Sequence, residues 1–261
     1  MSDTAKWSDL APRVISGVAM ALIGAVDIWI GGIIFEITVI GLCGIMIWEA
    51  ARMFGAEQTA AIRISLLGAA AVTIATVVPF LLVVPILLAA SLVGAGQVSR
   101  QKTLFTPFAA WILVAGFSVW VLRDEAGLIW ISWVVLIVIV SDIAGYFAGR
   151  MLGGPKFWPR ISPKKTWSGT VAGWIGAAAV GLCFAGPTRA GIALVPLSML
   201  VAFAGQMGDI LESLVKRRLG VKDSSNLIPG HGGVLDRLDA LLGASMLVMI
   251  LWLARALPGV A

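Results

Sequence analysis

The chain has 261 residues, of which 59% are hydrophobic and 13% charged, and its mean hydropathy is +0.99. These values exclude an ordinary soluble globular protein, in which about 25% of the residues are charged. The formal net charge of +5 does not indicate a nucleic-acid-binding protein, because the basic residues form no domain apart from the apolar segments. We therefore expect no nucleic-acid partner.

The apolar residues form repeated runs of about 17–20 residues, long enough to cross a hydrocarbon core as helices. Because the runs are continuous rather than alternating, they predict helices and not a barrel. The sequence thus predicts an all-α integral membrane protein with about nine transmembrane helices, and the count depends most on the tight connections at Gly31-Gly32 and Pro79. The expected spans are 14–30, 33–50, 63–79, 80–96, 105–122, 127–147, 168–185, 191–207 and 237–256.

The distribution of basic residues predicts the orientation of these spans. With nine spans and a cytoplasmic N-terminus, all but three of the 19 Lys and Arg residues fall on the cytoplasmic side. The exceptions are Arg123, Arg189 and Arg255. Such a positive-inside bias supports an odd number of spans, with the C-terminus outside. The first dozen residues lack a signal-peptide cleavage pattern, so the first span is expected to be an uncleaved anchor.

The two halves of the sequence differ in polarity. Residues 1–125 contain few polar groups and are expected to form a scaffold of transmembrane helices, in which Glu49 and Arg52 pair with each other or reach towards the interface. Residues 126–261 are expected to form a catalytic region, with long cytoplasmic loops at about 148–167 and 208–236.

Two pairs of glycines in the second half have the spacing that allows close helix packing. Gly145 with Gly149, and Gly169 with Gly173, each lie four residues apart. They predict close helix contacts, either inside the chain or at a dimer interface.

A polar helix face follows the eighth span. Asp209, Glu212, Ser213, Lys216 and Arg217 share one side of a helix. Because an Asp at mid-bilayer depth costs roughly 2.5–3.5 kcal/mol, this face is expected to line a polar cavity open to the cytoplasm. An internal ion-pair network without a ligand is the alternative.

The next segment is expected to be a loop that binds an anion. Gly220 fits a helix C-cap, and Lys222 supplies a positive charge to the loop that follows. His231 is the only histidine. A lone histidine is usually structural, but this one is expected to contact phosphate or to orient the loop. The glycines whose N–H groups can surround an anion are Gly230, Gly232 and Gly233.

The last helix opens with two acids on one face, Asp236 and Asp239. Carboxylates at a helix N-terminus are also favoured by the helix dipole, so simple capping is an alternative. Together with Asp209, they would supply carboxylates from two helices beside Lys and Arg, which suits Mg²⁺ bound with substrate phosphates. The lack of Cys and His clusters excludes a soft-metal site.

Two earlier segments are expected at the same cytoplasmic mouth. Asp142 ends the sixth span, one helical turn before Tyr146. The segment from Ser162 to Gly169 places lysines and hydroxyls just before a helix, a good arrangement for an anion, although basic loops near membranes often only touch lipid headgroups. The side chains concerned are Lys164, Lys165, Thr166 and Ser168.

The segment from Ser213 to Asp239 resembles the signature of the phosphatidate cytidylyltransferase (CDP-diacylglycerol synthase) family, without a departure. The segments SDIAGYFAGR, SPKKTWSG and GDILES also resemble the family, whereas residues 1–125 match it only in character. The signature positions in this chain are Ser213, Lys216, Arg217, Lys222, Asp223, Ser225, Pro229, His231, Gly232, Gly233, Asp236, Arg237 and Asp239.

The resemblance implies a magnesium-dependent nucleotidyltransferase that converts CTP and phosphatidate to CDP-diacylglycerol and pyrophosphate. It also implies a homodimer in the bacterial cytoplasmic (inner) membrane, among membrane lipids, with the active site at the cytoplasmic face. Asp209, Asp236, Lys216 and Lys222 are then expected to be catalytic. The expected metal ligands are Asp209 and Asp236, supported by Asp239 and Glu212, with room for a second cation. The expected substrate-binding residues are Lys164, Lys165, Thr166, Ser168, Ser213, Arg217, Asp223, His231, Gly232, Gly233, Arg237 and Asp142.

Three other functions fit the sequence less well. A CDP-alcohol phosphotransferase would need a D-G-x2-A-R type motif, which we do not find. An ion-coupled secondary transporter could use Asp209 and Asp142 as coupling acids, but transporters tend to place charges near the midplane in repeated halves. A non-catalytic membrane scaffold would not need the acids.

Overall fold

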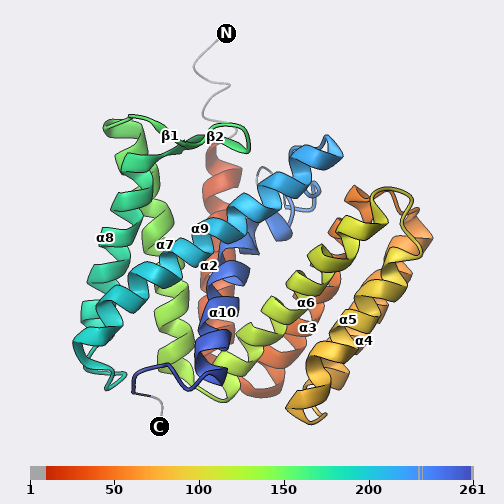
Figure 1. The fold of residues 1–261 in the computed structure, drawn as a ribbon, viewed down its shortest axis with the longest axis horizontal. Coiled ribbons are helices and arrows are strands. Elements are labelled where there is room, and N and C mark those ends of the chain that lie inside the picture. Colours follow the sequence, from red (N-terminus) through yellow and green to blue (C-terminus); the bar gives the residue numbers. More distant parts are fainter. Residues whose placement is uncertain (1–9, 229, 231, 260–261) are drawn as a thin grey trace. The chain divides into compact units, whose positions relative to one another are not determined.

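The structure is a computed structural model and describes residues 10–228, 230 and 232–259. This part of the chain forms nine α-helices, a 3-10 helix and a small antiparallel sheet, and each predicted span overlaps one of the helices (Figure 1). The elements are α2 (Leu10–Ile30), α3 (Gly32–Met53), α4 (Gln58–Ala75), α5 (Phe80–Ala95), α6 (Lys102–Asp124), α7 (Leu128–Met151), β1 (Lys156–Trp158), β2 (Ser162–Thr166), α8 (Trp167–Phe184), η1 (Gly191–Ala193), α9 (Leu194–Leu219) and α10 (Leu235–Leu253).

Within the described residues, six helical segments are long and apolar enough to cross a membrane, which supports an integral membrane protein. They are α3, α4, α6, α7, α8 and the continuous segment Gly191–Leu219. Two shorter apolar helices cover Gly17–Ile30 and Phe80–Ala95. Large apolar side chains on the helix surfaces are exposed, such as Leu66 (65%) and Leu81 (84%), as lipid contact requires. The predicted nine spans and their orientation stay predictions.

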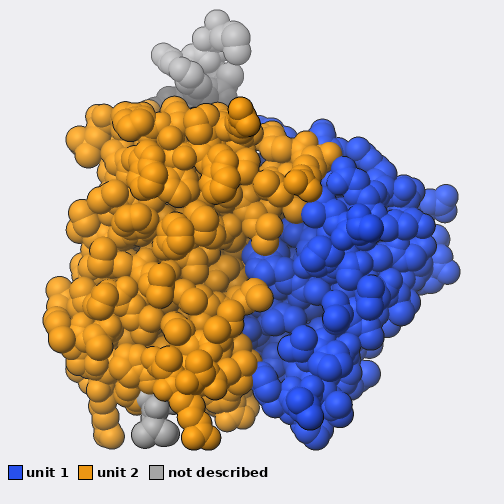
Figure 2. Space-filling model, viewed as in Figure 1, with its two compact units in different colours: residues 1–120, 219–238 blue, residues 121–218, 239–261 orange. Residues whose placement is uncertain are grey.

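The chain divides into two compact units that are not continuous in sequence (Figure 2). The first contains residues 1–120 and 219–238, and the second contains residues 121–218 and 239–261. The segment between α9 and α10 therefore returns to the N-terminal unit. The predicted division of function near residue 125 stays a prediction.

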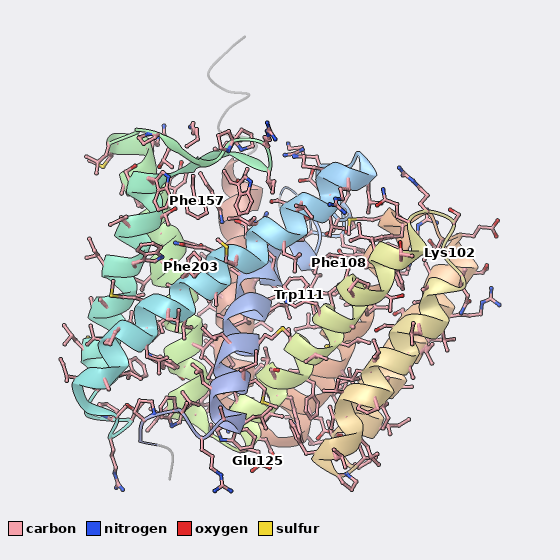
Figure 3. The ribbon with its side chains drawn as sticks, viewed as in Figure 1. Lys102, Phe108, Trp111, Glu125, Phe157 and Phe203 are labelled. Atoms are coloured by element: carbon pink, nitrogen blue, oxygen red, sulfur yellow. The ribbon has the colours of Figure 1, made fainter. Side chains whose placement is uncertain are left out.

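In the first unit, α3 packs against α4 and α4 packs against α5 (Figure 1). An aromatic cluster closes one end of this core, where the ring of Phe54 lies 5.2 Å from Phe105 and 6.1 Å from Phe108. Phe108 and Trp111 lie on successive turns of α6 (Figure 3). Their rings are stacked, with centroids 5.8 Å apart. These helices of the first unit therefore form a packed apolar core.

In the second unit, α7 and α8 run side by side (Figure 1). A Cβ added to Gly169 would lie 2.6 Å from the carbonyl oxygen of Gly145, and one added to Gly149 would lie 2.9 Å from Thr166 Oγ1. These glycines therefore allow close packing inside the chain, one of the two uses that their spacing predicted. A dimer interface stays a prediction.

The predicted loop at 148–167 contains regular structure. Strands β1 and β2 pair as an antiparallel hairpin, with Lys156 opposite Thr166. Thr166 then serves as the N-cap of α8 by accepting a hydrogen bond from the N–H of Gly169 (3.2 Å). Phe157 of β1 lies edge-on to Trp167, with ring centroids 4.7 Å apart. The hairpin is therefore fixed to the first turn of α8.

Candidate functional site

Three acidic side chains converge in the second unit. Asp209 and Glu212 lie on α9 and Asp239 lies on α10, and one ligand atom from each falls within 4.8 Å of the others. Glu212 is fully buried and Asp239 is 9% exposed, whereas the side chain of Asp209 is 33% exposed. Within the described residues, this carboxylate cluster is the group of three or more potential ligands that could hold a metal ion.

Glycines allow the two helices to approach closely enough to form the carboxylate cluster. Gly208, which precedes Asp209, lies against Gly243 of α10, and a Cβ added to Gly243 would come within 2.9 Å of Gly208 Cα. One added to Gly205 would lie 3.1 Å from the carbonyl oxygen of Ala240, which follows Asp239. The smallest residues thus lie beside the acids at the helix crossing.

Two lysines balance part of the negative charge. Lys165 of β2 places its Nζ 2.5 Å from Asp209 Oδ2, and Lys216 places its Nζ 2.5 Å from Glu212 Oε2. Ser213 donates a hydrogen bond to Asp209 Oδ1 (3.2 Å). Asp209 with Ser213, and Glu212 with Lys216, are therefore i,i+4 contacts along α9. The polar cavity that this face is expected to line stays a prediction.

The donor chemistry of the carboxylate cluster fits a hard divalent cation. Its ligands are carboxylate oxygens from two helices, the kind that Mg²⁺ and Ca²⁺ prefer. Three carboxylates facing two lysines leave one formal negative charge. The ion pairs also match the alternative of an internal network, so the identity of a bound cation stays a proposal.

Asp236 lies one helical turn before Asp239 but makes its hydrogen bonds within the first unit. Its carboxylate accepts from the N–H of Ser224 (2.9 Å), the hydroxyl of Ser224 (2.9 Å) and the N–H of Gly233 (2.7 Å). These bonds hold the segment between α9 and α10, residues 220–234, which we call the signature loop. Asp236 lies in the first turn of α10, where the helix dipole favours a carboxylate, but these bonds go to the loop and not to the helix. Its role as a metal ligand stays a prediction.

The signature loop begins as predicted. Gly220 follows the last residue of α9 with φ of +74°, a conformation that favours glycine, so the predicted C-cap is confirmed. Lys222 and Asp223 are exposed in the turn that follows. The N–H of Ile228 donates to the carbonyl of Gly232 (2.8 Å) and narrows the loop. His231 and Pro229 lie outside the described residues.

The remaining predicted substrate-binding residues differ in their surroundings. Thr166 is buried and caps α8, and Ser168 is within hydrogen-bonding distance of its hydroxyl (3.0 Å). Both hydroxyls are thus engaged within the protein. Exposed side chains are those of Asp142 on α7, Lys164 on β2, Arg217 on α9 and Arg237 on α10. Their binding roles stay predictions.

Two polar residues make contacts that the sequence did not predict. Glu49 of α3 does not pair with Arg52, which was one of the two arrangements expected. Its carboxylate binds the signature loop, whereas Arg52 donates to the carbonyl of Ala56. Gln206, one turn before Asp209, accepts from Trp174 Nε1 (3.1 Å) and donates to Ser141 Oγ (3.4 Å), which links α7, α8 and α9. A lone polar side chain in an apolar helix was the available signal for both residues.

Comparison with known proteins supports the predicted resemblance. A profile of the cytidylyltransferase family matches residues 11–254. The phosphatidate cytidylyltransferase of Brucella suis biovar 1 (strain 1330) is 37% identical over 264 residues, covering 97% of this chain and 97% of its own length. That of Helicobacter pylori (strain J99) is 30% identical over 92% of this chain and 91% of its own. That of Bacillus subtilis (strain 168) is 39% identical over 46% of this chain and 45% of its own.

The match therefore extends well beyond the signature, into the N-terminal helices that resembled the family only in character. Because the profile covers most of the chain and two relatives align along nearly its whole length, the protein belongs to the cytidylyltransferase family.

Proposed function

We propose that this protein is an integral membrane phosphatidate cytidylyltransferase, which makes CDP-diacylglycerol and pyrophosphate from CTP and phosphatidate. One observation carries the proposal: the phosphatidate cytidylyltransferase of Brucella suis is 37% identical over 97% of both chains. The lysine-flanked carboxylate cluster adds chemical support, because such groups suit a polyphosphate bound with a divalent cation.

The proposed reaction is a substitution at phosphorus. A phosphate oxygen of phosphatidate forms a bond to the α-phosphorus of CTP, and the bond from that phosphorus to the oxygen bridging the β-phosphorus breaks, so pyrophosphate leaves. Reactions of this kind depend on positioning and charge neutralisation more than on covalent catalysis. A phosphate monoester is largely ionised near neutral pH, so the nucleophile does not require a strong general base.

In this proposal, Asp209, Glu212 and Asp239 would hold Mg²⁺, and Asp236 remains a further ligand predicted from the signature. The bound cation would neutralise charge on the phosphate oxygens. Lys165 and Lys216 hold the cluster acids in the free protein and would turn towards substrate phosphates when the cation occupies the acids. The exposed Lys222 and Arg217 would bind the triphosphate, and Lys164 would bind either phosphate group.

We further propose the predicted topology: nine spans, a cytoplasmic N-terminus and a site on the cytoplasmic face of a bacterial inner membrane. The basic residues at 156–165 and 216–222 support a cytoplasmic site under the positive-inside rule. Homodimer formation belongs to the same proposal. No observation favours the transporter.

The function is tested with protein purified in detergent, mixed micelles of phosphatidate, radiolabelled CTP and Mg²⁺. We expect labelled CDP-diacylglycerol and an equal amount of pyrophosphate, and no product when EDTA is added. Diacylglycerol in place of phosphatidate is the matched control, because it lacks the nucleophilic phosphate. Failure to form CDP-lipid with folded protein would contradict the proposal.

A further inference from the structure

Glu49 is an acidic residue of the N-terminal helices that contacts the signature loop. It lies near the C-terminal end of α3, and it is fully buried. Its carboxylate accepts four hydrogen bonds from residues 175 to 186 positions later in the chain. The donors are the hydroxyl of Ser225 (2.6 Å), the N–H of Leu235 (2.7 Å), the N–H of Val234 (2.9 Å) and the hydroxyl of Ser224 (3.3 Å).

These four bonds explain how a carboxylate is accommodated in the core. A buried carboxylate is costly unless donors satisfy its oxygens. Val234 and Leu235 lie at the start of α10, where backbone N–H groups have no partner within the helix and the helix dipole favours negative charge. Glu49 thus caps α10 from a different helix.

Gly233 of the signature loop has no side chain, which leaves room for the carboxylate of Glu49. A Cβ added to Gly233 would lie 2.5 Å from Glu49 Oε1 and would also collide with the hydroxyl of Ser224. That hydroxyl lies between two acids, at 3.3 Å from Glu49 Oε2 and 2.9 Å from Asp236 Oδ2. The loop is therefore held by two carboxylates, one from α3 and one from α10.

We propose that Glu49 is a positioning residue that fixes the signature loop in the conformation that binds CTP. The inference rests on the proposed function for the identity of the nucleotide. Glu49 itself touches no substrate, since its oxygens are taken up by the loop. It acts through Lys222, Asp223 and Asp236, which the same backbone presents.

The test compares Glu49→Gln with the wild type. The amide replaces one accepting oxygen with a donor, so at least one loop N–H loses its partner. We expect the KM for CTP to rise by about tenfold or more, from the cost of leaving a buried donor unsatisfied. The KM for phosphatidate should stay within about twofold, because the mutation acts on the nucleotide loop. Glu49→Asp keeps the charge and should restore part of the affinity for CTP.

Glu36→Gln is the matched control. Glu36 is a half-buried acid of the same helix whose carboxylate accepts a hydrogen bond from Thr76 (2.9 Å) and which is not bonded to the loop. We expect its kinetic constants to equal those of the wild type. If the substitutions only destabilised α3, both Glu49→Gln and Glu36→Gln would differ from the wild type. The change would then appear in the KM for CTP and for phosphatidate, or in turnover.

Hydrogen exchange of the protein without substrate separates this inference from the function itself. In Glu49→Gln, the amides of Val234 and Leu235 should exchange faster than in the wild type, with no change in Glu36→Gln. If the wild type makes no CDP-lipid, the proposed function fails. The hydrogen-exchange rates still test whether Glu49 holds the signature loop. If Glu49→Gln does not fold, Ser225→Ala removes one tethering bond and should shift exchange and the KM for CTP in the same direction. The inference would be overturned if the variant that folds, Glu49→Gln or Ser225→Ala, showed the same amide exchange and the same KM for CTP as the wild type.

Discussion

At the level of single residues, two acids of the carboxylate cluster pair with lysines, and the two pairs differ in how deeply they are buried. Glu212 is fully buried beside Lys216, whereas Asp209 is partly exposed beside Lys165. A partly exposed acid next to a lysine on a hairpin can exchange that partner for a cation at small cost, because exposed ion pairs are weak. Asp209 is therefore the cluster member that we expect to respond most directly to Mg²⁺.

Replacing Asp209 with Asn should lower turnover by on the order of a hundredfold or more, because one charged ligand of a catalytic cation is lost. The concentration of Mg²⁺ that gives half-maximal activity should also rise. The control is Asp27→Asn, which changes an acid of α2 that accepts a hydrogen bond from Thr38 (3.0 Å). A variant at Asp209 with normal turnover and Mg²⁺ dependence would remove this residue from the metal site.

Lys165 allows a separate prediction about charge. Lys165→Met keeps the length of the side chain but removes the ammonium group that faces Asp209. We expect kcat/KM for CTP to fall by about 10- to 100-fold, as for the loss of one charge-assisted contact to phosphate. Lys156→Met, on the paired strand of the same hairpin, should have little effect. Equal losses in both variants would indicate only a general effect of hairpin charge.

At the level of helices, the site depends on how closely α9 and α10 approach. A Cβ on Gly243 would contact the carbonyl oxygen of Ala204 and the backbone of Gly208, so Gly243→Ala must push the helices apart. We expect a loss of stability of about 1–3 kcal/mol, as for other overpacked sites, and a larger proportional loss of activity. The measurements are thermal unfolding in detergent and the CDP-lipid assay.

Gly41→Ala is the matched control for this helix crossing. Gly41 lies inside α3 with nothing within 4 Å of an added Cβ. Alanine there should be neutral or stabilise by about 0.5–1 kcal/mol, because glycine is the poorer helix former. If Gly243→Ala were as stable and as active as this control, the site would not depend on the close approach of α9 and α10.

The sequence predicted these elements unevenly, for physical reasons. Apolar runs located the nine α-helices of the described part of the chain, because length and hydropathy are properties of each segment alone. The face of Asp209 and the C-cap at Gly220 followed from helical periodicity and glycine chemistry. The hairpin at 156–166 was missed because its strands are only three and five residues long. The pairing of Glu49 with the signature loop was also missed, since no local pattern predicts a contact 175 positions away.

At the level of the whole molecule, topology sets which substrates can reach the site. Helix α8 separates the basic hairpin from the turn at Arg189, so a single crossing by α8 places these two segments on opposite faces. In the topology that we propose, the positive-inside rule predicts that the hairpin lies in the cytoplasm. CTP would then meet the site from the compartment in which nucleotides are made.

Single cysteines at positions 156 and 189 test this orientation. Both native cysteines, buried Cys43 and exposed Cys183, are first replaced by Ser. In intact spheroplasts, a membrane-impermeant maleimide should label the cysteine at position 189, and should label position 156 only after permeabilisation. Labelling in the reverse order would overturn the orientation, and labelling of both from outside would remove the crossing by α8.

The long separation between Glu49 and its partners has a consequence for biosynthesis. Translation runs at about 5–20 residues per second, so Ser224 leaves the ribosome roughly 9–35 s after Glu49. During that interval the acid of α3 sits in a nascent membrane protein without the donors that later surround it. Chains released early, before α10 is made, would retain this unsatisfied group and would be natural substrates for membrane quality-control proteases. A helix that is translated late thus completes the surroundings of an acid in a helix that is translated early.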